Sequence, residues 1–80
     1  MDQWFSPPVK LWLKADKAWA VTRVALAAEI LLFDWPKEAR GTAKHRAARE
    51  ACLACLEGKG TAEQVRSALE AAAKEAGILH

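Results

Sequence analysis

Alanine supplies eighteen of the eighty residues of this chain, and most of these alanines follow Val24. Alanine has the highest intrinsic helix propensity, because its side chain loses no rotamer freedom in a helix. The alanine content therefore favours helix over sheet for most of the chain.

Length and composition limit the kind of fold and site that the chain can build. Hydrophobic residues make up 52% of the sequence and charged residues 28%, which argues against disorder. Eighty residues suit a single domain, residues 1–80, whose thin core leaves little room for a deep enclosed pocket. We therefore expect an open cleft or a flat face as the functional surface.

Charge and hydropathy argue against several partners. Twelve basic and ten acidic residues leave a net charge of +2, too near neutral to indicate nucleic acid or an anionic membrane by itself. The most apolar stretch, Val24 to Phe33, is interrupted by Glu29 and is too short to span a bilayer, so we expect no membrane partner. The first eight residues do not have the pattern of a signal peptide. The expected location is the cytoplasm.

A β-hairpin is predicted over about residues 9–21, after an irregular N-terminus. The segment 9–14 alternates between apolar and polar residues as a half-buried strand does, and residues 18–21 can return as a second strand. Three apolar residues of the first strand fall on one side: Val9, Leu11 and Leu13.

The sequence leaves open the register of the hairpin and an alternative in which the segment is helical. The turn lacks Gly or Asn, so the register is not fixed, and Trp19 can lie opposite either Leu13 or Lys14. A rival interpretation makes Lys10 to Phe33 one long helix, because its residues tolerate helix well. We prefer the hairpin, which the alternation favours.

Three helices are predicted after the hairpin, which gives an α+β fold. Thr22 is the expected N-cap of the first helix, and Pro36 ends it by moving Trp35 out of the α region. The segment Gly58-Lys59-Gly60 ends the second helix. An apolar stripe of the first helix is expected at Val21, Ala25, Ala28 and Leu32, beside a second one at Val24, Ala27 and Leu31. The predicted helices cover about residues 23–34, 42–57 and 61–76.

The third helix has the strongest local signals. Thr61 and Gln64 have the spacing of a capping box, in which each side chain bonds to the backbone N–H of the other residue. Gly77 is the expected terminator. The buried stripe is predicted at Val65, Leu69, Ala72 and Ala76.

Several short motifs, in order along nearly the whole chain, resemble those of a known family. They are Phe5-Ser6-Pro7-Pro8-Val9, Asp34-Trp35-Pro36 followed by Gly41, Ala48 to Cys52, Leu56-Glu57-Gly58 and Ala71 to Ile78. The chain resembles a small alpha-proteobacterial family, number nine hundred eighty-two among the domains of unknown function. The resemblance supports a hairpin followed by helices and implies no catalytic residues, since the family has no established activity. At Leu69 the resemblance implies an aromatic residue instead, so the core is expected to be repacked there.

Cys52, Cys55 and His45 are the candidates for redox or metal chemistry. The two cysteines lie well inside the second predicted helix, so they lack the helix N-terminus that activates thioredoxin-type thiols. Even with His45 they provide three zinc ligands, whereas structural zinc usually has four. We therefore interpret the cysteines as core residues and expect His45 to border the core and reach solvent. No metal and no cofactor is expected.

A basic segment over residues 37–49 is the best argument for an anionic partner such as nucleic acid or a phosphorylated ligand. It lacks a Gly-rich phosphate loop and interleaved aromatic residues for base stacking. Anion or nucleic-acid binding is therefore the alternative hypothesis. Its residues are Lys37, Arg40, Lys44, Arg46 and Arg49.

Two apolar residues are predicted to lie on the surface. Leu53 falls on the polar side of the second helix, and Trp12 projects from the lysine face of the hairpin. Such residues are favoured at protein interfaces. The preferred hypothesis is a non-catalytic protein-interaction module that binds an unknown protein or a second copy of itself. No enzymatic activity is expected, because no acid, base and nucleophile are spaced to act together.

Overall fold

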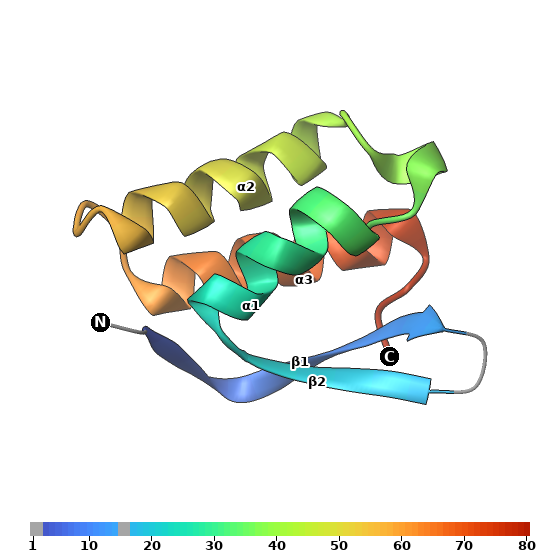
Figure 1. The fold of residues 1–80 in the computed structure, drawn as a ribbon, viewed down its shortest axis with the longest axis horizontal. Coiled ribbons are helices and arrows are strands. Elements are labelled where there is room, and N and C mark those ends of the chain that lie inside the picture. The colour runs from blue at the N-terminus through green and yellow to red at the C-terminus, as the bar shows by residue number, and fades with distance from the viewer. Residues whose placement is uncertain (1–2, 15–16) are drawn as a thin grey trace.

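The computed structural model describes residues 3–14 and 17–80, and it has the α+β arrangement that the sequence predicts. An antiparallel two-stranded hairpin is followed by three helices (Figure 1). A π-helix, η1, continues α1, and a short 3-10 turn, η2, precedes α2. The elements are β1 (Trp4–Lys14), β2 (Lys17–Arg23), α1 (Val24–Glu29), η1 (Ile30–Asp34), η2 (Lys37–Ala39), α2 (Ala43–Leu56) and α3 (Ala62–Ala76).

The hairpin pairs in a register that differs from both predicted ones. Trp19 lies opposite Leu11, because the register shifts between Trp12 and Lys14. Leu11 is buried with Val9, as the alternation predicts, whereas the side chain of Leu13 lies outside the described residues. The rival long helix from Lys10 to Phe33 is wrong, because Trp4–Lys14 and Lys17–Arg23 form strands.

β1 is longer than predicted and is paired along both edges. It begins at Trp4, within the segment that was expected to be irregular, and Trp4 lies opposite Arg23 of β2. On its other edge, Leu11 forms an antiparallel bridge with Leu79. The backbone N–H of Trp12 donates to the carbonyl oxygen of Ile78 at 2.7 Å. Residues near the end of the chain thus cover the edge of β1 that β2 leaves open.

The first helix begins without a side-chain cap. Thr22 still belongs to β2, so the predicted N-cap is wrong; Arg23 occupies the cap position and its side chain makes no capping bond. The helix continues as η1 to Asp34, and Trp35 then adopts extended dihedral angles before Pro36. That ending agrees with the steric effect of the proline.

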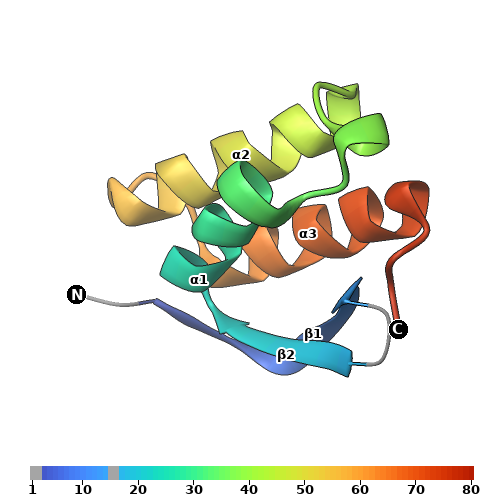
Figure 2. The same cartoon turned by 45° about the vertical axis from the view of Figure 1, so that its right-hand side comes forward.

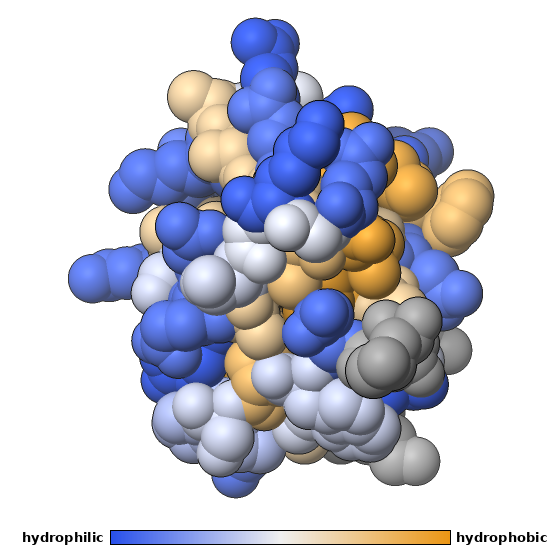
Figure 3. All heavy atoms as spheres, turned by 90° about the vertical axis from the view of Figure 1, so that its left-hand side faces the viewer, coloured by the Kyte–Doolittle hydropathy of each residue, from blue (hydrophilic) through white to orange (hydrophobic). Residues whose placement is uncertain are grey.

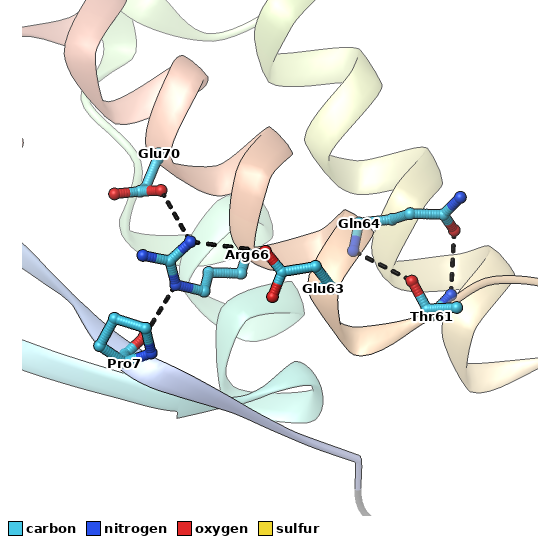
Figure 4. Close-up of polar contacts among 6 residues, drawn as sticks. All are labelled: Pro7, Thr61, Glu63, Gln64, Arg66 and Glu70. Carbon is cyan, nitrogen blue, oxygen red and sulfur yellow. Dashed lines mark hydrogen bonds and ion pairs between the residues drawn. The ribbon is translucent and has the colours of Figure 1, made fainter.

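Both later helices begin with a side-chain cap, and the capping box predicted for the third helix is confirmed. Thr42 caps α2 and its hydroxyl oxygen accepts from the backbone N–H of His45. The capping box of Thr61 and Gln64 is present at the start of α3 (Figure 4). Gly77 ends α3 with φ of 74°, a left-handed conformation that suits glycine.

Arg66 of α3 attaches the helix to the start of the hairpin. Its Nε donates to the carbonyl oxygen of Pro7 at 3.0 Å, and Nη1 lies 3.2 Å from a carboxylate oxygen of Glu70 and 3.7 Å from one of Glu63 (Figure 4). The guanidinium group therefore joins two segments that are 59 positions apart in the sequence.

The elements form three layers. The hairpin packs against α1 and α3, and α2 packs against the same two helices from the opposite side (Figures 1 and 2). The large buried side chains of the core come from the hairpin, the first helix and the residue after it, and α3, and include Leu11, Val21, Ile30, Leu31, Trp35, Val65 and Leu69, whereas α2 contributes the smaller Ala48, Cys52 and Cys55. This arrangement leaves the outward faces of α1, η1 and α2 to form a surface together.

Candidate interaction surface

An open groove lies between the first helix and α2. Its volume is about 330 Å³, and Figure 3 shows apolar surface recessed among hydrophilic side chains on this side of the molecule. We call it the α1–α2 groove. It is lined by Ala28 and Leu32 from the first helix and by Arg49, Glu50, Cys52, Leu53 and Leu56 from α2.

Three leucines give the groove its apolar character although they are accessible to solvent. Leu32 is 53% exposed, Leu53 58% and Leu56 47%. Phe33, which follows Leu32 in η1, is 73% exposed. Folding leaves this apolar area in water, so covering it with another surface is favourable.

Small residues explain why the groove is hollow. Ala28 has only a methyl group, and Cys52, which lines the α2 side, is a small residue and is buried. Larger residues at these positions would fill the space between the two helices. The leucines therefore stand at the edges of a recess.

The charged residues that line the groove have no bonding partner within the described part of the protein. Among the described residues, neither Arg49 nor Glu50 takes part in an ion pair or a side-chain hydrogen bond; the ion pairs found there are those of Arg66. A cation and an anion at the edge of an apolar recess are thus free to pair with a partner.

Leu53 and Trp12 were both predicted to lie on the surface, and both are exposed. They do not form one surface, because Trp12 belongs to the hairpin and Leu53 to α2, on opposite sides of the middle layer (Figure 2). The Trp12 ring lies against the imidazole of His80, with 4.8 Å between ring centroids. Leu53 is the one of the two that lines the groove.

Arg40 of the basic segment bonds to two backbone carbonyl groups. Arg40 donates from Nε to the carbonyl oxygen of Trp35 at 2.8 Å and from Nη2 to that of Phe33 at 3.1 Å. It thereby satisfies carbonyl groups at the end of η1. The other four basic residues are all exposed, and Arg49 also lines the groove: Lys37, Lys44, Arg46 and Arg49.

His45 is buried, so the expectation that it reaches solvent is wrong; only 3% of it is exposed. Its Nδ1 accepts from the backbone N–H of Gly41 at 3.2 Å. Its Nε2 lies 2.9 Å from the carbonyl oxygen of Leu31 and donates to it. Because both ring nitrogens are occupied, neither is available as a metal ligand or a general base in this conformation.

The two cysteines are free and buried in the core. Burial, and secondarily the neighbouring Cys55, raises the pKa of the Cys52 thiol from 9.0 to about 11. Reactive cysteines have a lowered pKa, so this environment suits packing. Within residues 3–14 and 17–80, no group of three or more His, Cys, Asp or Glu residues could hold a metal ion.

Sequence reasoning missed Leu32, Phe33 and Leu56 as surface residues. It assigned Leu32 to an apolar stripe of the first helix, but the buried residues there are Val24, Ala27, Ile30 and Leu31. The second predicted stripe is the one that faces the core. Leu32 directly follows the buried Leu31, and consecutive residues of a helix point to different sides, which was the available signal.

Comparisons with known proteins identify a family and no individual relative. A family model described as "Protein of unknown function (DUF982)" matches residues 7–80. Neither the curated proteins nor the solved structures include a match. None of the helices in the described part of the chain is long and apolar enough to cross a membrane. The family match covers nearly the whole chain, which therefore belongs to the family of unknown function DUF982.

Proposed function

We propose that the protein is a non-catalytic interaction module and that the α1–α2 groove is its docking surface. The observation that carries the proposal is the exposure of Leu32, Leu53 and Leu56 around one recess. Fully burying a leucine side chain is worth about 1.5–3 kcal/mol. A partner that covers three partly exposed leucines thus gains several kcal/mol before the cost of association.

The chemistry around the groove supports binding over catalysis. Its ionisable residues are Arg49, Glu50 and Cys52, and the pKa of the Cys52 thiol is raised. The imidazole of His45 is engaged by two backbone groups and does not line the groove. The groove therefore provides apolar contact and two charges, as a protein interface does.

The proposal includes a cytoplasmic setting in an alpha-proteobacterium. Two unpaired thiols, Cys52 and Cys55, suit a reducing compartment. The open shape of the groove suits a protein surface better than a small molecule, which is usually enclosed on most sides.

Anion or nucleic-acid binding by residues 37–49 is the second candidate. Lys37, Lys44 and Arg46 support it because they are exposed near the start of α2. The engagement of Arg40 by two carbonyl groups weakens it. Phosphate binding would weaken steeply as salt is raised, whereas an apolar interface would persist.

Photo-crosslinking in cells tests the proposed function. A benzophenone amino acid replaces Leu53 in one variant and Ser67, an exposed residue of α3, in the control. We expect ultraviolet light to join a protein to position 53 and not to position 67. Free monomer alone at position 53, in cells that express the protein at its normal level, would contradict the proposal.

A further inference from the structure

The outer face of α2 carries charges of opposite sign on either side of Leu53. Arg49 lies four residues before Leu53 and Glu57, the C-cap residue, lies four residues after it. Each step of four residues rotates about 40° around a helix, so the three side chains fall on one face. Arg49 and Glu57 are separated by about 12 Å along the axis. All three residues are exposed.

This order makes the face complementary to itself in one orientation. If two α2 helices meet antiparallel across a two-fold axis at Leu53, position 49 of each lies opposite position 57 of the other. Two cation–anion pairs then flank a central contact between the two leucines. A parallel arrangement would place Arg49 opposite Arg49 and Glu57 opposite Glu57, which repel.

The charges on this face are free to form such pairs. Within the described residues, neither Arg49 nor Glu57 makes an ion pair or a side-chain hydrogen bond. Arg46 and Glu50, also exposed on α2, contribute one further charge of each sign. The two arginines balance the two glutamates, so the face has no net charge. Two copies of it therefore do not repel each other through a net charge.

We propose that the partner in the α1–α2 groove is a second copy of the chain, bound through antiparallel α2 helices. The inference rests on the proposed function and names the occupant of the same groove. In the pair, Leu53 of each copy packs against Leu53 and Leu56 of the other. Arg49 of each copy pairs with Glu57 of the partner copy, which fixes the register.

Charge reversal tests this register directly. The variants Arg49→Glu and Glu57→Arg each place like charges opposite each other twice in a homodimer. In a mixture of the two variants, every pair is again a cation and an anion. We therefore expect each variant alone to dimerise roughly ten- to a hundredfold more weakly than the wild type. Mixing them should restore dimers, all of them mixed.

Native mass spectrometry separates the three dimers when one variant is labelled with nitrogen-15. Lys74→Glu and Glu75→Arg, at exposed positions of α3, are the matched controls and should dimerise like the wild type. Circular dichroism checks that every variant is folded, which is expected because the substituted side chains are exposed.

The outcomes separate this inference from the proposed function. Mixed dimers from two weakly associating variants support the inference. A wild-type dimer that is insensitive to both reversals overturns it, because another surface then forms the dimer. A wild type that stays monomeric also overturns it; if position 53 then crosslinks to a different protein in cells, the proposed function stands. If position 53 crosslinks to nothing, both fail.

Discussion

His45 of α2 donates from Nε2 to the carbonyl oxygen of Leu31 in η1, across 2.9 Å and within the core. The same ring accepts from the N–H of Gly41, and it lies against the indole of Trp35 with 5.8 Å between ring centroids. One imidazole thus holds the start of α2 to the end of the first helix. These two elements form the walls of the groove.

Replacing His45 with alanine should destabilise the fold. His45→Ala removes two buried hydrogen bonds and leaves a cavity beside Trp35, so we expect the free energy of unfolding to fall by about 2–4 kcal/mol. Urea denaturation measures it. Lys44→Ala, at the exposed neighbouring position, should stay within about 0.5 kcal/mol of the wild type. A His45→Ala variant as stable as the Lys44→Ala control would contradict this role.

Arg66→Met should loosen the start of β1 from α3. Methionine keeps much of the apolar stem but loses the bond to the carbonyl oxygen of Pro7 and the pairs with Glu63 and Glu70. Because the carboxylates are partly exposed, we expect a loss of only about 0.5–2 kcal/mol. Amide hydrogen exchange should speed up in β1 near Pro7 and remain unchanged in α2. Equal changes in both elements would argue against a local link.

Cys52 should make stability depend on alkaline pH. Because its pKa is raised from 9.0 to about 11, the folded protein holds the thiol proton at pH values where the unfolded chain has lost it. The free energy of unfolding therefore falls as pH rises from about 9 to about 11, and the total loss is about 2–3 kcal/mol. Urea denaturation of the wild type and Cys52→Ala at pH 8 and pH 10.5 measures it. The Cys52→Ala variant should lose less stability over this interval; equal losses would refute the assignment.

Leu69 gives a test of the core. It is fully buried in α3, where the family resemblance implies an aromatic residue. The core is packed to fit a leucine at this position, so the larger ring of Leu69→Phe should overpack it. We expect the free energy of unfolding to fall by about 1–3 kcal/mol. Thermal unfolding measures the change, with Leu69→Met as the control that conserves volume and should cost less than about 1.5 kcal/mol. A Leu69→Phe variant more stable than the wild type would show that the core has room for the ring.

The parts of the fold that sequence predicts depend on neighbouring residues. The capping box at Thr61, the glycine at position 77 and the ending before Pro36 each act within a few residues, and all three are present. Thr22 failed as a cap because pairing with β1 extends β2 to Arg23. That pairing outweighs a local preference.

The groove could be predicted only in part, because two separate elements form it. The polar neighbours of Leu53 on α2 were enough to predict that it is exposed. The exposure of Leu32 could be predicted only by knowing which side of the first helix packs against α3 and the hairpin. The burial of His45 depended on Gly41 and Leu31, and no spacing in the sequence links all three.

Sedimentation velocity of the purified protein, over a concentration series at low and high salt, tests the central claim most directly. The wild type should form a dimer that persists at high salt, since apolar contact contributes most of its stability. Leu53→Asp should sediment as a folded monomer at the same concentrations, because it places two carboxylates at the centre of the contact. A wild type that remains monomeric throughout, or a Leu53→Asp variant that dimerises as the wild type does, would contradict a self-associating groove.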